Sequence, residues 1–243
     1  MQISAKTLGD LKSHNFCQRC FWVKTHQKQL PYQIFPGIFN SIDSYTKSIV
    51  MDYVSREGKL PDWLKDIGEV NRAYKNAADA MKGKNIKSKA KFNVQYKDVL
   101  LTGIPDAIYQ RPNRDIVIVD YKTARYTSGQ DDLLPVYEIQ LNGYAYIAEK
   151  LGIKPVESLY SIYFEPPERE SHEVIAKRYT TAEGFEMPFK PVVHRIRKDT
   201  KEIETLMDKA YGIYALTNPP KGRKECKDCK NVANLSNLLY SRK

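Results

Sequence analysis

The sequence of 243 residues has no long apolar run. A helix needs roughly 20 apolar residues to cross a bilayer, and no segment approaches that length. The N-terminal stretch MQISAKTLGDLKSH lacks the apolar segment of an export signal. No internal repeat is visible, and neither a helicase motif nor a Walker A motif occurs. We therefore expect a cytoplasmic protein without a membrane span, and any unwinding of nucleic acid would need another protein.

The charge is unbalanced towards the basic side. Lys and Arg outnumber Asp and Glu by 39 to 29, which gives a formal net charge of +10. Such an excess favours a polyanionic partner, because each contacted phosphate releases condensed counterions. Seventeen tyrosines supply stacking faces for unpaired bases, although we expect most of them in the core or half-buried on strands. Charge therefore supports a nucleic-acid partner without establishing one.

The N-terminal third of the chain predicts helices. Residues 4–14 predict a short helix with Ser4 as its N-cap. Apolar residues at helical intervals predict a longer helix from about residue 37, then a break at Gly58 to Pro61 and a second helix ending near residue 82. A basic loop, KGKNIKSKAK, follows at residues 82–91.

The central part of the chain carries β-rich runs separated by short polar turns. The runs are KFNVQY at 91–96, DVLLTGIPDAIYQ at 98–110 and DIVIVDYKT at 115–123. Connections this short predict antiparallel neighbours. The remaining predicted elements are a helix at 136–151 ended by Gly152, a strand at 156–164, a pair of strands at 172–180 and 189–197 that extends the sheet, and a last helix at 199–216. This order predicts an α/β fold with a mixed central sheet (three antiparallel strands, helix, strand) flanked by helices.

Two carboxylates and a lysine fall on neighbouring predicted strands. Asp106 lies in an apolar strand, and Asp120 ends the run Ile116-Val-Ile-Val with Lys122 two residues further on, on the same face. A carboxylate in a sheet is costly unless something neutralises it. Mg²⁺ or Mn²⁺ would do so, with the backbone carbonyl of Tyr121 as a further oxygen ligand. The alternative is a strand-end ion pair between Asp120 and Lys122, with Asp106 as a turn residue.

The following helix adds two polar residues to this set. Gln140 and Tyr144 stand at i and i+4, on one helical face. With the segments Gly103-Ile-Pro-Asp106, Ile118-Val-Asp120-Tyr-Lys122-Thr123 and Gln140-Leu-Asn-Gly-Tyr144, the sequence resembles the PD-(D/E)xK nuclease superfamily, and within it the RecB-like branch that includes CRISPR adaptation exonucleases.

That resemblance implies a restriction-endonuclease-like core and assigns roles to individual residues. It implies that Asp106 and Asp120 bind the metal, that Lys122 assists hydrolysis, and that Gln140 and Tyr144 contact the DNA and the active site. Many RecB-like nucleases also have a histidine ligand on an upstream helix, after a glycine. The matching segment, residues 36–43, has no histidine, and Asn40, Ser41 or Asp43 could fill the position through an oxygen. The four histidines are scattered and are expected on the surface or in the core: His14, His26, His172 and His194.

The four cysteines form two CxxC pairs near opposite ends of the chain: Cys17 with Cys20, and Cys226 with Cys229. Two such pairs complete a tetrahedral thiolate site, whereas disulfides are disfavoured in a reducing compartment. Zn²⁺ and a [4Fe–4S] cluster both accept four cysteines. The resemblance tips the expectation towards iron–sulfur, with structural zinc as the alternative. We expect the site to join terminal arms at 1–30 and 217–243 of one nuclease domain spanning 1–243.

The leading functional expectation is a Mg²⁺- or Mn²⁺-dependent deoxyribonuclease, an exonuclease or end-processing enzyme. Its substrate would be single-stranded DNA or duplex ends, in DNA repair, recombination or CRISPR adaptation, with a helicase or other repair proteins as partners. The alternative is a catalytically weak nuclease-fold module that binds DNA or protein in a repair complex. The missing histidine favours the alternative, and the complete set of Asp, Asp, Lys, Gln and Tyr favours the enzyme.

Overall fold

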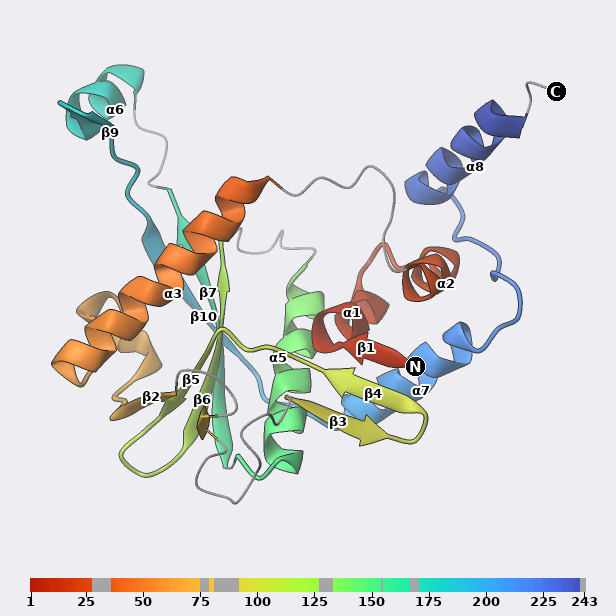
Figure 1. Ribbon diagram of the computed structural model, residues 1–243, viewed down its shortest axis with the longest axis horizontal. Helices are drawn as coiled ribbons and strands as arrows, with labels where there is room; N and C mark the ends of the chain where they lie inside the picture. Colours follow the sequence, from red (N-terminus) through yellow and green to blue (C-terminus); the bar gives the residue numbers. More distant parts are fainter. Residues whose placement is uncertain are drawn as a thin grey trace.

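The central sheet is mixed, as the sequence predicts. A computed structural model describes residues 1–27, 36–74, 79–80, 92–126, 133–153, 155–166 and 171–240. In spatial order the sheet contains β10 (Lys190–Ile196), β7 (Val156–Glu165), β6 (Ile116–Lys122), β5 (Ala107–Gln110) and β2 (Arg72–Tyr74). β6 and β7 run parallel and the other neighbours antiparallel. The sheet therefore has three antiparallel strands, a connecting helix and a returning strand, but its third antiparallel strand is β2, whereas the run predicted at 91–96 forms β3 (Asn93–Tyr96) in a separate sheet (Figure 1).

Helices cover both faces of this sheet (Figure 1). The helices and 3₁₀ turns are α1 (Ala5–Gly9), η1 (Asp10–Lys12), α2 (Gln18–His26), α3 (Gly37–Glu57), η2 (Asp62–Ile67), α5 (Leu134–Lys150), α6 (His172–Tyr179), α7 (Glu202–Tyr214) and α8 (Lys227–Tyr240). α5 lies against one face, in a core that also includes α1 and α7 residues, while α3 and η2 cover the opposite face. Ser4 caps α1, as predicted, by accepting a hydrogen bond from the backbone of Thr7.

β6 is the strand that positions the site. Its first six residues are buried, so it reads as a continuous apolar run rather than an alternating one. Ile118 faces α5, while Val117 and Val119 face α3 and η2. Asp120 and Lys122 share the α5 side of the strand because side chains alternate with a period of two. A buried strand therefore ends in two charged residues beneath α5.

The β-rich run at 98–110 is divided between two sheets, which corrects its prediction as one strand. β4 (Val99–Thr102) lies in a separate sheet between β1 (Gln2–Ser4) and β3 (Asn93–Tyr96), whereas β5 belongs to the central sheet. The break falls at Gly103-Ile104-Pro105. Because Pro105 has no N–H to donate to a ladder, the strand ends there and the chain changes sheets.

Two further expectations need correction. The run at 172–180 forms α6 instead of a sheet strand, because Ser171 caps it and Lys177 and Arg178 suit its C-terminal end. After the break at Gly58, the chain forms η2 and then β2 in place of the start of a second long helix. The last helix, α8, begins inside the second CxxC pair and projects from the rest of the chain (Figure 1). A small ribbon of β8 (Thr180–Thr181) and β9 (Gly184–Phe185) completes the strands.

Two other expectations concern membrane spans and the basic loop. Among the residues that the structure describes, no helix has the length and apolarity required to cross a lipid bilayer. The basic loop at 82–91 lies outside the described residues.

Candidate active site

The two predicted carboxylates meet at the ends of adjacent strands. β5 and β6 pair Ala107 with Val119, so Asp106, the residue before β5, lies beside Asp120. The Asp106 side chain is 14% exposed and that of Asp120 is 6% exposed. Oδ2 of Asp106 accepts a hydrogen bond of 2.8 Å from the backbone N–H of Tyr121. The antiparallel register therefore places two carboxylates next to each other at the edge of a buried core.

Asp120 is held from two sides. Its Oδ1 accepts a hydrogen bond of 2.8 Å from Nε2 of Gln140, and its Oδ2 lies 2.6 Å from Nζ of Lys122. The second contact is an ion pair without hydrogen-bond geometry, and within the described part of the chain Oδ2 has no hydrogen-bond donor. Burial raises the pKa of Asp120 to about 6, with Lys122 opposing and Asp106 adding to the rise.

Lys122 is fixed in place by groups other than Asp120. Its Nζ donates a hydrogen bond of 3.0 Å to Oε1 of Gln140 and lies 3.9 Å from the centroid of the Tyr137 ring. A ring face attracts an ammonium group through the ring quadrupole. These contacts direct the ammonium at Asp120 and leave it less freedom than a surface lysine has.

Gln140 and Tyr144 lie on one face of α5, as their spacing predicts. Both are buried, and Nε2 of Gln140 also donates a hydrogen bond of 2.8 Å to the hydroxyl of Tyr144. Because an ammonium group can only donate hydrogen bonds, the end of Gln140 that faces Lys122 must be the acceptor Oε1. The two N–H donors of Nε2 then face Asp120 and Tyr144. All five residues Asp106, Asp120, Lys122, Gln140 and Tyr144 are thus brought together.

Gly103 determines how closely Tyr144 approaches the strands. A Cβ atom at this position would lie 2.7 Å from the ring of Tyr144, far inside van der Waals contact. Only glycine allows this approach of ring and backbone. The glycine of the Gly103-Ile-Pro-Asp106 segment is therefore required by the packing of the site.

A further residue, Lys47, reaches the carboxylates from α3, and sequence reasoning missed it. Its Nζ lies 2.8 Å from Oδ1 of Asp106 and 2.6 Å from Oδ2 of Asp43. Burial lowers the pKa of Lys47, but the hydrogen bonds from Lys47 to Asp106 and Asp43 produce a net rise. The i, i+4 spacing of Asp43 and Lys47 was the available signal. Of the three candidates for the histidine position, Asn40 and Ser41 are exposed, and Asp43 reaches Asp106 through this lysine.

The Tyr121 side chain points away from the carboxylate pair. Its hydroxyl is 2.7 Å from that of Tyr109, in the core on the α3 side. Its backbone N–H contributes to the site through Asp106. The role expected for its carbonyl oxygen stays a prediction.

The donor set fits a hard divalent cation. Asp106 and Asp120 present carboxylate oxygens side by side, and each carboxylate has one oxygen fixed by an N–H donor. Within the described segments, the buried Oδ2 of Asp120 has no hydrogen-bond donor, and the close partners of this atom and of Oδ1 of Asp106 are ammonium groups. Mg²⁺ and Mn²⁺ prefer such oxygens. Asp106 and Asp120 are accordingly the residues that could hold the metal.

The four cysteines meet in a second cluster, as the CxxC pairs predict. Their sulfur atoms all lie within 4.8 Å of one another, with three close separations of 3.5, 3.6 and 3.6 Å. All four are free thiols. Burial raises the pKa of Cys17, but backbone hydrogen bonds from Arg223 and Cys20 lower it to about 6, which favours the thiolate that metals bind. Burial raises the pKa of Cys20 and of Cys229 above the usual thiol value. The cluster joins the start of α2 to the start of α8.

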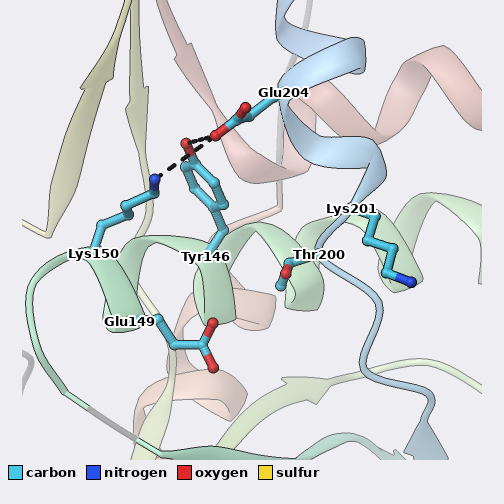
Figure 2. A pocket seen from close by; sticks show the side chains of 6 residues that line it. All are labelled: Tyr146, Glu149, Lys150, Thr200, Lys201 and Glu204. Carbon is cyan, nitrogen blue, oxygen red and sulfur yellow. Dashed lines mark hydrogen bonds and ion pairs between the residues drawn. The ribbon is translucent and has the colours of Figure 1, made fainter.

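The groove between α5 and α7 is separate from both clusters (Figure 2). Its lining residues are Tyr146, Glu149, Lys150, Thr200, Lys201 and Glu204. Two lysines balance two glutamates, and the Tyr146 hydroxyl donates to Glu204 at 2.7 Å. The groove contains none of the predicted site residues.

The remaining basic and histidine candidates lie elsewhere. Arg195 and Arg197 are exposed, and their predicted contacts with phosphate remain predictions. His26 is stacked between Trp22 and Tyr214. Among the residues that the structure describes, no histidine side chain forms a hydrogen bond or an ion pair with Asp106 or Asp120, in line with the sequence of α3.

The match to a protein family agrees with this geometry. The family model of the PD-(D/E)XK nuclease superfamily matches residues 43–232. The crystal structure of SSO0001 is similar with a TM-score of 0.40 and 14% sequence identity, over 96% of this chain and 84% of that one. No curated protein matches the sequence. Since the family match spans most of the chain and includes both carboxylates and Lys122, the chain belongs to the PD-(D/E)XK nuclease superfamily.

Proposed function

We propose that this nuclease hydrolyses phosphodiester bonds in DNA with Mg²⁺ or Mn²⁺ held by Asp106 and Asp120. The observation that carries the proposal is the contact between Lys122, Asp120 and Gln140, which directs an ammonium at one member of a pair of adjacent carboxylates. A bound Mg²⁺ or Mn²⁺ would polarise the scissile phosphate and lower the pKa of a coordinated water. An ion pair that served stability alone would not need a second carboxylate beside it, because that carboxylate raises the pKa of Asp120.

Three further side chains, those of Lys122, Gln140 and Tyr144, have roles in this proposal. Lys122 orients the attacking water or stabilises the charge that develops on the phosphate in the transition state. Gln140 holds Asp120 and Lys122 in place relative to each other, because its Nε2 donates to Asp120 and its Oε1 accepts from Lys122. Tyr144 in turn holds Gln140 by accepting its hydrogen bond. A fixed arrangement matters because catalysis depends on positioning groups before the reaction begins.

DNA is the proposed substrate, either single-stranded or as duplex ends. The net charge of +10 supports a polyanion. An exonuclease or end-processing role in repair, recombination or CRISPR adaptation, beside a helicase or other repair proteins, follows from the resemblance described above. The second candidate, a weakly catalytic binding module, draws support from the missing histidine and from Lys47, whose ammonium group lies against Asp106.

We also propose that the cysteine cluster is a structural site for a single zinc ion, the alternative to the expected iron–sulfur cluster. A tetrahedron with Zn–S bonds of about 2.3 Å has edges of about 3.8 Å. The close sulfur separations of 3.5 and 3.6 Å are near this value. A [4Fe–4S] cube spreads its thiolates more widely, because each cysteine binds a different iron at a different corner.

The nuclease proposal is tested with labelled single-stranded and duplex DNA in Mn²⁺ or Mg²⁺. Lys122→Ala should lower the cleavage rate by about 100-fold or more, because it removes a positioned charge. Lys201→Ala, an exposed lysine outside the site, should retain the wild-type rate. Full activity of Lys122→Ala, or of the wild-type protein in excess EDTA, would refute the proposal.

A further inference from the structure

We propose that Lys47 is an internal cation that competes with the divalent metal for Asp106 and binds the substrate phosphate when the metal is bound. The inference rests on the proposed function, because it assigns a regulating residue to the same site. Lys47 comes from α3, on the opposite side of the sheet from α5 (Figure 1). None of the three short motifs that carry the resemblance, at 103–106, 118–123 and 140–144, includes this lysine.

The two carboxylate oxygens of Asp106 have different partners. Oδ2 is held by the backbone N–H of Tyr121, which the strand keeps in place. Oδ1 is held by Nζ of Lys47 at 2.8 Å, at the end of a flexible four-carbon chain that is 34% exposed. Oδ1 is therefore the oxygen for which a divalent cation would compete with an ammonium group.

Asp43 gives the ammonium a second partner. It lies one helical turn before Lys47, and its Oδ2 is 2.6 Å from Nζ. Asp43 is 40% exposed, so it lies on the solvent side of the pair. If Lys47 leaves Oδ1 of Asp106, Asp43 can retain it close to the site instead of letting it move into bulk solvent.

The net charge of the site depends on Lys47. Asp43, Asp106 and Asp120 carry three negative charges, and Lys47 and Lys122 carry two positive charges. A divalent cation would make this group net positive, which attracts a phosphodiester. Without Lys47 the same cation would only neutralise the group. Lys47 should thus weaken metal binding and strengthen the binding of DNA in the presence of metal.

The test uses the whole chain and two readouts other than cleavage. Mn²⁺ binding is measured by calorimetry, and the component lost in Asp106→Ala defines binding at this site. DNA affinity is measured by fluorescence anisotropy with Ca²⁺ in place of Mn²⁺. Lys47→Met should tighten the Asp106-dependent Mn²⁺ binding by about tenfold and weaken DNA binding by a similar factor.

Two variants serve as controls. Arg56→Met removes an exposed positive charge from the last turn of α3, where its partners are the exposed Asp52 and Glu57, and should alter neither affinity. Lys47→Arg keeps the charge and should retain wild-type Mn²⁺ affinity. Thermal unfolding of each variant checks that α3 still packs on the sheet.

The outcomes separate this inference from the function on which it rests. Unchanged Mn²⁺ affinity in a folded Lys47→Met variant, or an equal change in Arg56→Met, would overturn the role of Lys47 while leaving the nuclease proposal in place. If the wild-type protein showed no Asp106-dependent Mn²⁺ binding, the proposed function and this inference would both fail.

Discussion

Gln140 donates a 2.8 Å hydrogen bond to Oδ1 of Asp120, and this contact joins helix α5 to strand β6 at the centre of the site. The other end of the same amide accepts from Lys122. One neutral side chain therefore fixes the distance between a carboxylate and an ammonium of opposite charge. A buried carboxylate without such a donor would be costly, so the contact serves both stability and the proposed chemistry.

Replacing Gln140 with alanine should affect both properties. The change leaves a buried carboxylate oxygen without its donor, which should lower the free energy of unfolding by about 1–3 kcal/mol. Cleavage should fall as well, because Lys122 loses an acceptor that orients it. Urea unfolding and a DNA cleavage assay measure the two effects. Lys150→Ala, an exposed change on the same helix, should alter neither, and a fully stable, fully active Gln140→Ala variant would contradict this account.

The pKa of Asp120 gives a pH dependence of defined sign. Burial raises this pKa from 3.8 to about 6, so between these values the folded protein keeps a proton that the unfolded chain loses. Ionisation of Asp120 therefore destabilises the fold as pH rises through this window, and the full cost is present above about pH 6. Without added divalent cation, Asp120→Asn should gain stability relative to wild type as pH increases.

The size of this gain follows from the shift. About two pKa units correspond to a change on the order of 2–3 kcal/mol between about pH 4 and pH 7. Denaturant unfolding of both proteins across this range measures it. A stability difference that stays constant with pH would show that Asp120 is not shifted. Mn²⁺ binding should weaken below about pH 6 for the same reason, since the ion needs the carboxylate form.

The cysteine cluster should contribute to folding through its metal. Cys17→Ser removes a buried ligand and should lower the melting temperature markedly, because metal binding at a structural site adds to the folding free energy. Metal analysis should find one zinc per chain and no absorption near 400 nm, the region typical of iron–sulfur proteins. Lys227→Ala, an exposed change inside the second CxxC pair, is the matched control. An unaltered melting temperature after removal of the metal would rule out the structural role.

The close approach of Gly103 and Tyr144 can be tested with a pair of glycine substitutions. Gly103→Ala would place a methyl group 2.7 Å from the Tyr144 ring, so the ring or the strand must shift. Stability should fall by about 1–3 kcal/mol and cleavage should decrease with it. Gly212→Ala, in helix α7, meets no atom within 4 Å and should be neutral or slightly stabilising. Similar stability of both variants would contradict the packing argument.

Local patterns predicted the elements that carry the site with good accuracy. The continuous apolar run of β6, the helical spacing of α5 and the N-cap at Ser4 are encoded by neighbouring residues, so the sequence alone identified them. The prediction of a strand at 172–180 was wrong, because the same apolar residues suit either a helix or a strand and the cap at Ser171 decided in favour of α6. β2 was missed because a strand of three residues has no clear period.

Contacts between segments that are distant in the chain could not be predicted from the sequence. The division of 98–110 between two sheets depends on β1, about a hundred residues earlier, pairing with β4. The role of Lys47 depends on the packing of α3 against the sheet, since its partner Asp106 lies 59 positions away in the chain. Neither relationship leaves a periodic signal, because contacts between distant segments are set by how the elements pack together.

The chain by itself determined which chemistry was available: carboxylates and a lysine at the end of a buried strand, a polar helix face to meet them, and two pairs of thiols. Only the tertiary structure decided how these groups are used. It placed Gln140 between Asp120 and Lys122, brought the four sulfur atoms together from opposite ends of the chain, and set Lys47 against Asp106. The physical reason is that local preference fixes the type and position of a side chain along its element, whereas distances between charges depend on strand register and helix packing.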